Sequence, residues 1–113
     1  GQRGAQLEAR DRLGYTPLAL ACEAGSLAVV QLLVDRGAKL WARQPGGSTL
    51  LHVAAVKGDV GVLRFLLGRG GLRLDEASES GATPLYTAAC RGHLEAVQLL
   101  VDQHGAAVNG GQQ

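Results

Sequence analysis

The chain has 113 residues and a formal net charge of +1, so its length allows one compact unit and its charge gives no general attraction to nucleic acid or membrane surfaces. Only 4% of the residues are aromatic, so the core is expected to consist of small and medium aliphatic side chains. Two cysteines are too few for a disulfide scaffold. Neither a signal peptide nor an apolar run of about 20 residues is present, which favours a cytoplasmic or nuclear location.

A sequence unit recurs three times at a nearly constant interval. Gly14–Leu18 returns as Gly47–Leu51 and again as Gly81–Leu85, so the two steps are 47 − 14 = 33 and 81 − 47 = 34 residues. A period of this length is typical of repeat architectures, in which each unit buries its apolar face against its neighbours.

Each unit is expected to begin with a short helix. A threonine stands at the N-cap position, and a glycine that can adopt a positive φ is expected to end the helix near residues 24, 57 and 91. The threonines are Thr16, Thr49 and Thr83, and the glycines are Gly25, Gly58 and Gly92. Pro17 and Pro84 suit the first helical position, whereas Leu50 replaces proline in the middle unit and predicts a weaker start there.

A second helix is expected after each helix-ending glycine. Apolar residues recur there at positions i, i+3, i+6 and i+7, which places one apolar stripe on each helix. The stripes are Leu27, Val30, Leu33 and Val34, then Val60, Leu63, Leu66 and Leu67, then Leu94, Val97, Leu100 and Val101. Extended links are expected to close the units at residues 37–40, 71–74 and 105–108.

The Thr-Pro-Leu motifs, the Gly92-His93 pair and the Leu99-Leu100 pair resemble the ankyrin repeat family along residues 4–109. This resemblance implies an all-α ankyrin-repeat solenoid of stacked helix-turn-helix pairs joined by β-hairpin-like loops. It divides the chain into the tail of a preceding repeat at 1–10, repeats at 11–41, 42–75 and 76–109, and a flexible tail at 110–113. We interpret the chain as an excerpt of a longer array, whose apolar ends are expected to promote end-to-end self-association.

The chain departs from the family pattern at several positions of the unit. The histidine that follows the family's Thr-Pro-Leu motif is present only as His52, because Ala19 and Tyr86 stand at the equivalent places. The aspartate of the family's hairpin is replaced by Gln44 and Ser78 in the second and third units. These replacements predict looser hairpins around residues 44 and 78.

The sequence predicts no catalytic, cofactor or metal site. His52, His93 and His104 have no nucleophile or orienting group placed beside them, and a slab of stacked helices is expected to lack a pocket large enough for a metabolite. Residues 68–71 are glycine-rich but lack the context of a phosphate-binding loop. Cys90 and His93 have the spacing of a metal-ligand pair, but zinc requires three or four ligands and no second pair accompanies them.

The resemblance implies that partners dock on the concave side, which is formed by the hairpin tips and the first helices. The candidate partner-binding residues there are Arg12, Leu13, Tyr15, Glu23, Arg43, Pro45, Ser48, Val56, Lys57, Glu79, Ser80, Cys90 and Arg91, and Ala24 and Ala82 are expected on the same side. Four cations against two anions give this set a net charge of 4 − 2 = +2. That excess favours an acidic or phosphorylated peptide, unless these charges are merely solvated.

Trp41 occupies a link position where the family usually has a small polar residue. Tryptophan is enriched at binding hot spots, so Trp41 is a candidate partner-binding residue. The alternative is that the ring covers the backbone of a neighbouring link.

Two classes of function stay open. In the first, the array is a protein–protein interaction module, an adaptor, scaffold or substrate-recognition segment such as that of a ubiquitin ligase. In the second, it is a passive spacer or regulatory module of an enzyme whose catalytic domain lies outside this segment. Neither class requires a nucleic acid or membrane partner.

Overall fold

The computed structural model describes the backbone of residues 6–69 and 72–112, and the side chains of these residues up to position 103. The parts of the predicted N-terminal tail, second link and C-terminal tail that fall on residues 1–5, 70–71 and 113 lie outside the described residues.

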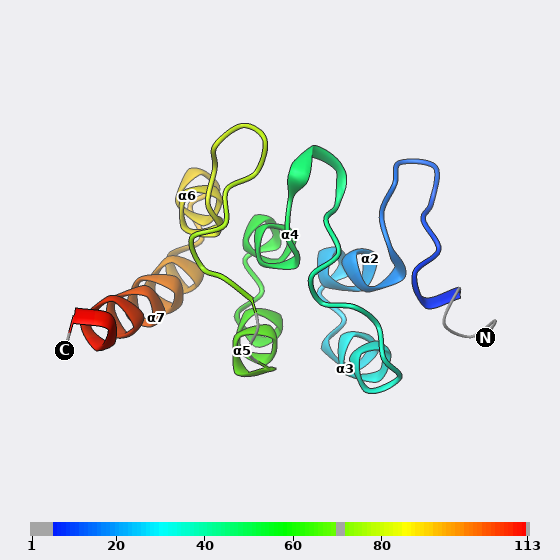
Figure 1. Ribbon diagram of the computed structural model, residues 1–113, viewed down its shortest axis with the longest axis horizontal. Coiled ribbons are helices and arrows are strands. Elements are labelled where there is room, and N and C mark those ends of the chain that lie inside the picture. The colour runs from blue at the N-terminus through cyan, green and yellow to red at the C-terminus, as the bar shows by residue number, and fades with distance from the viewer. Residues whose placement is uncertain (1–5, 70–71, 113) are drawn as a thin grey trace.

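Three helix pairs follow one another along the chain. They are α2 Pro17–Ala24 with α3 Leu27–Asp35, α4 Leu50–Lys57 with α5 Val60–Arg69, and α6 Pro84–Cys90 with α7 Leu94–Gln112. The first helices form one row, the second helices form another, and the connecting loops project beyond the first row (Figure 1). Each first helix packs on the next one, and each second helix does the same, which confirms the all-α repeat solenoid.

The helix boundaries follow the predicted capping residues. The three threonine side chains accept hydrogen bonds from the backbone N–H groups of Ala19, His52 and Tyr86. Gly25, Gly58 and Gly92 adopt φ values of 73°, 75° and 73°, which side chains with a Cβ rarely tolerate.

Gly58 is required for a second reason. A Cβ atom at this position would lie 2.4 Å from the ring of His93, so the absence of a side chain lets the third repeat approach the second. The glycine therefore serves both helix termination and repeat stacking.

The start of helix α4 is better capped than the absence of a proline predicts. Thr49 accepts from the backbone of His52, while Nδ1 of His52 accepts from the backbone N–H of Thr49 at 3.1 Å. This capping box satisfies two N–H groups at the start of α4. The prediction of a weaker start is therefore wrong, because a side chain replaces what proline would have contributed.

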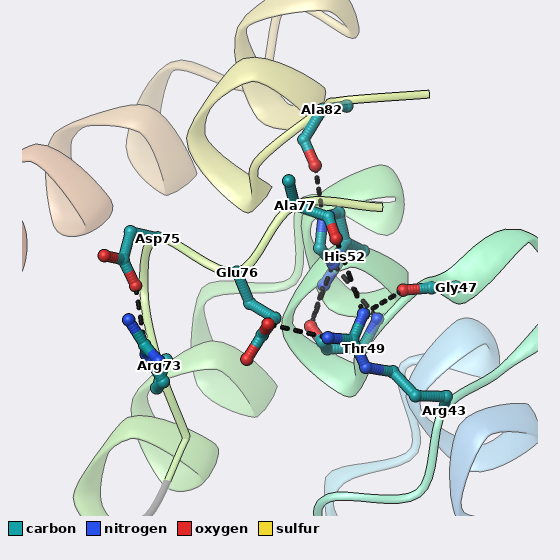
Figure 2. A network of polar contacts seen from close by, with 9 residues as sticks. All are labelled: Arg43, Gly47, Thr49, His52, Arg73, Asp75, Glu76, Ala77 and Ala82. Carbon is teal, nitrogen blue, oxygen red and sulfur yellow. Dashed lines mark hydrogen bonds and ion pairs between the residues drawn. The ribbon is translucent and has the colours of Figure 1, made fainter. Parts of the chain in front are cut away.

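His52 also joins the second repeat to the third. Its Nε2 lies 2.7 Å from the carbonyl oxygen of Ala82, in the next hairpin (Figure 2). A carbonyl oxygen only accepts, so Nε2 carries the hydrogen and Nδ1 is left to accept from Thr49. The imidazole is 3% exposed, so both bonds are shielded from water.

The three hairpins share one backbone hydrogen bond, and whether those around residues 44 and 78 are looser stays a prediction, because Asp11 also accepts from the N–H groups of Leu13 and Tyr15. Asp11, Gln44 and Ser78 each donate the shared backbone hydrogen bond to the residue four positions later, at 2.8–2.9 Å. Gln44 is buried and its Oε1 accepts from the backbone N–H of Thr16 at 3.1 Å. The glutamine of the second repeat thus binds the first, where Ala19 offers no imidazole.

The core follows the predicted stripes in the first two repeats. Val30, Leu63 and Leu66 are fully buried, and Leu100 is 2% exposed in the third repeat. The third stripe is wrong at Leu94 and Val101, whose side chains are 69% and 48% exposed. These two side chains are exposed because α7 packs on α5 from one side, whereas α5 lies between α3 and α7 (Figure 1). Whether this apolar end promotes self-association stays a prediction.

The last helix is longer than the sequence predicts. Helix α7 continues to Gln112, so the predicted extended link at 105–108 is wrong, whereas the flexible tail at 110–113 stays a prediction. A glycine permits a helix to end but does not require it, and the Ala106-Ala107 pair has the highest helix propensity. In contrast, α3 ends at Asp35, and Gly37 follows with φ of 99°.

Replacing Leu100 with alanine should lower the free energy of unfolding by about 2–5 kcal/mol, because Leu100 is buried between α7 and its neighbours. Chemical denaturation followed by circular dichroism measures this loss. Leu94→Ala is the matched control on the same helix, and its effect should stay within about 0.5 kcal/mol. Equal losses in the two variants would mean that α7 packs differently.

Replacing His52 with alanine should cost about 2–4 kcal/mol, because it removes a helix cap and leaves the Ala82 carbonyl without its partner. Tyr86→Ala tests the equivalent position of the third repeat, where the ring is 62% exposed, and should cost less than about 1 kcal/mol. A larger loss for Tyr86→Ala would contradict the assignment of His52 as the inter-repeat contact.

Candidate functional site: the concave surface

A hollow of about 400 Å³ lies between the hairpin loops and the first helices. All three repeats contribute to its lining, because residues at equivalent positions of successive units stand side by side. Six of the predicted partner-binding residues lie in this lining: Tyr15, Glu23, Ser48, Val56, Ser80 and Arg91. We call this feature the concave hollow.

Five further residues line the concave hollow but were not among the predicted partner-binding residues. They are His52, Val53, Ser78, Ala82 and Thr87. Ala82, the third-unit equivalent of Tyr15 and Ser48, was expected on the concave side, whereas Val53 and Thr87 are equivalent to each other and to no predicted residue. His52 carried no signal of its position either, since its equivalents are Ala19 and Tyr86.

Arg43 lies outside the hollow and holds two hairpins together. Its guanidinium donates to the carbonyl oxygen of Gly47 in its own hairpin and forms an ion pair with Glu76 at 2.6 Å (Figure 2). Arg10, one period earlier, donates at 2.8 Å to the carbonyl oxygens of both Gly14 and Arg43. Each arginine therefore links the hairpin of its own repeat to that of the next.

Two more predicted residues also contact the neighbouring hairpin. Pro45 lies 3.2 Å from the position that a Cβ of Gly14 would occupy. The side chain of Glu79 lies against Gly47, and its backbone N–H donates to the carbonyl oxygen of Gly46 at 2.9 Å. These residues pack the loops that form one wall of the hollow.

The other predicted residues are exposed but do not line the hollow. They are Arg12, Leu13, Trp41, Lys57 and Cys90. The side chain of Lys57 runs toward the first repeat, with Cε 3.5 Å from the position of a Gly25 Cβ. Trp41 is 70% exposed, so its indole offers a large accessible surface, and its part in binding stays a prediction.

The charge of the hollow differs from that of the predicted set. Among its lining residues, Glu23 is the one acidic side chain and Arg91 the one basic side chain, with the imidazole of His52 counted as neutral. Their sum is −1 + 1 = 0. The expected excess of positive charge is therefore not a property of the hollow, because Arg43 is paired with Glu76 and Arg12 and Lys57 lie outside.

The histidines have structural contacts where the side chains are described. His52 is bound on both ring nitrogens, and Nε2 of His93 lies 2.8 Å from the carbonyl oxygen of Val56. Within the described residues, no group of three or more His, Cys, Asp or Glu side chains is placed to hold a metal ion. No helix there is long and apolar enough to cross a membrane. The His104 side chain lies outside the described part.

The expectation that no hollow reaches metabolite size is too strict. A second hollow, of about 430 Å³, lies beside α2 and α3 and is lined by Leu7, Leu32 and Leu33 among others. Volumes of 300–1,000 Å³ are typical of small-molecule sites.

The two cysteines have opposite environments. Burial, and to a smaller extent the charge of Asp59, raises the pKa of the Cys22 thiol from 9.0 to about 12. Cys90 is exposed on α6, where its side-chain hydrogen bond raises the pKa of Tyr86. Both thiols are free.

At pH 8 one thiol should react with a thiolate-specific reagent in the folded chain, and two should react in denaturant. Cys22 stays protonated because its pKa lies far above that pH, and the thiol form is a poor nucleophile. Mass spectrometry after timed quenching measures the stoichiometry. Cys90→Ser should abolish the fast labelling, whereas loss of labelling in Cys22→Ser would contradict the assignment.

Comparison with known proteins agrees with this architecture. The family model for ankyrin repeats in three copies matches residues 41–111, and the model for a single ankyrin repeat matches residues 13–44. The chain is 42% identical over 109 residues to ankyrin repeat domain-containing protein 63 of Homo sapiens, and to the same extent to that of Mus musculus. Both matches cover 94% of this chain, which spans only 29% and 28% of the two relatives.

Ankyrin repeats are generally protein–protein interaction modules. This chain belongs to the ankyrin repeat family, as its three helix pairs, the hydrogen bonds between its hairpins and the matching family models show.

Proposed function

We propose that the chain is an adaptor or substrate-recognition module that binds a segment of another protein in the concave hollow. The proposed role of the chain is to bind a protein segment, and it includes no catalytic step. The observation that carries the proposal is the continuity of the hollow, since Tyr15, Val56 and Arg91 come from three different repeats and line one surface. A partner that spans the array would contact all three.

The composition of the hollow supports this role. Val56 at its middle is 38% exposed, so it offers apolar area without being part of the packed core. Tyr15 supplies an aromatic ring, a side chain enriched at binding hot spots. Arg91 is exposed and provides a guanidinium that can form two hydrogen bonds with one carboxylate.

The rigidity of the site supports it as well. The hairpins that form one wall are tied together by Arg10, Arg43 and His52. A surface that is already ordered loses little conformational entropy when it binds. The proposal therefore expects the hollow to be present before the partner arrives.

Val56→Glu should weaken binding of a captured partner about tenfold or more, because it places a charge in the apolar middle of the hollow. Arg91→Glu should weaken it as well. A pull-down with the 113-residue chain identifies the partner, and calorimetry at fixed salt compares the variants.

Arg64→Glu is the control, because Arg64 is exposed on α5 and does not line the hollow. Binding that survives Val56→Glu and Arg91→Glu but is lost in Arg64→Glu would place the partner on the second helices. If neither the unchanged chain nor any variant captures a partner, that result would favour the passive-spacer alternative.

A further inference from the structure

We infer that the concave hollow selects an extended peptide segment with a basic and an acidic side chain about six residues apart and an aliphatic side chain between them. This inference rests on the proposed function and adds the chemistry of the partner. It replaces the acidic or phosphorylated segment that the composition of the surface suggested.

The first argument is the distribution of charge along the hollow. Glu23 belongs to α2 in the first repeat, and Arg91 follows α6 in the third. Both side chains are exposed, and in the described part of the chain the ion pairs are Arg43–Glu76 and Arg73–Asp75, so neither Glu23 nor Arg91 is neutralised there. Opposite charges at the two ends favour a ligand with the complementary charges.

The second argument is the apolar middle. Between the two charged ends lies α4, which contributes Val53 and Val56 to the lining. Val56 is the more accessible of the two, and an aliphatic side chain laid over it would remove apolar surface from water on both partners. A charged residue at the centre of the ligand would lose hydration there without gaining a partner.

The spacing follows from the stacking of the repeats. Glu23 and Arg91 are two repeat steps apart, and packed helices lie about 10 Å from one another, which gives about 20 Å between the two ends. An extended chain advances about 3.3 Å per residue, so about six residues cover that length. A helix would need about 13 residues for the same span.

The polar lining favours an extended ligand over a helical one. Ser48, Ser78 and Ser80 bring hydroxyl groups to the hairpin side of the hollow. An extended backbone presents N–H and C=O groups that hydroxyls can bind, whereas a helix satisfies these groups internally. Ser78 and Ser80 already share a hydrogen bond of 3.0 Å, so Ser48 is the most available of the three.

The experiment is a selection from a random dodecapeptide display library on the 113-residue chain, followed by binding measurements on the enriched peptides. Clones that bind the Val56→Glu chain equally well are discarded, because they bind elsewhere. The remaining sequences should carry a basic and an acidic residue five to seven positions apart with an aliphatic residue between them.

A double-mutant cycle then tests the pairing. Glu23→Gln should weaken a selected peptide about 3- to 10-fold, and this effect should vanish when the peptide's basic residue is replaced by glutamine. Arg91→Gln should behave likewise with the acidic residue. Glu95→Gln and Arg64→Gln, exposed on α7 and α5 and outside the hollow, are matched controls that should change the Kd less than about twofold.

The outcomes separate the two proposals. Peptides that require Val56 but are uniformly acidic, or that are insensitive to Glu23→Gln and Arg91→Gln, would overturn this inference and leave the proposed function standing. If no enriched peptide depends on Val56, both proposals fail. Peptides with the stated pattern and coupling support both.

Discussion

The contact between one repeat and the next is the constraint on which this structure depends. A single helix pair of 33 or 34 residues cannot bury its own apolar face, so each unit is stable only against a neighbour. Aliphatic side chains such as Leu63 and Leu66 supply the apolar part of this contact. Directed hydrogen bonds, of which the bond from His52 to the Ala82 carbonyl is the clearest, fix its geometry.

Those bonds differ from one interface to the next, although the backbone repeats. At the second interface an imidazole reaches forward from His52 to the following hairpin. At the first interface an amide reaches back from Gln44 to the N–H of Thr16. Both side chains also accept from the N–H of a threonine cap, since Nδ1 of His52 accepts from Thr49 and Oε1 of Gln44 accepts from Thr16. An N–H group at the start of a helix has no partner within that helix, so the two solutions satisfy the same need. A repeat protein can therefore lose a family residue at one position and recover the bond from another.

Because one side chain can replace another as the hydrogen-bond partner, only part of the fold could be predicted from the sequence. The threonine caps and the helix-ending glycines act on their own backbone within a few residues, so their spacing was sufficient. The role of Gln44 depends on a residue 28 positions earlier, and nothing in its immediate surroundings indicates it. The exposure of Leu94 depends likewise on which helices pack beside α7. An apolar stripe in the sequence does not indicate how many neighbouring helices cover it.

The same distinction applies to the concave hollow. The family resemblance implies that Tyr15, Ser48 and Val56 lie on the concave side, and the structure brings them together. Charge was less predictable, since whether an arginine faces a partner or its own chain depends on carboxylates and carbonyls from the next repeat. Arg43 is paired with Glu76, whereas Arg91 forms no ion pair among the described residues. The surface proposed to bind a partner is thus the part that contacts between the repeats leave exposed.

Amide chemical-shift mapping of the 15N-labelled chain during titration with a selected peptide tests this account most directly. We predict that the largest shifts fall on Tyr15, Ser48, Val56 and Arg91, in all three repeats at once, while Gln31, Arg64 and Gln98 on the second helices stay unchanged. Shifts confined to one repeat, or centred on α3, α5 and α7, would contradict the claim that the joined hairpins and first helices form the binding surface.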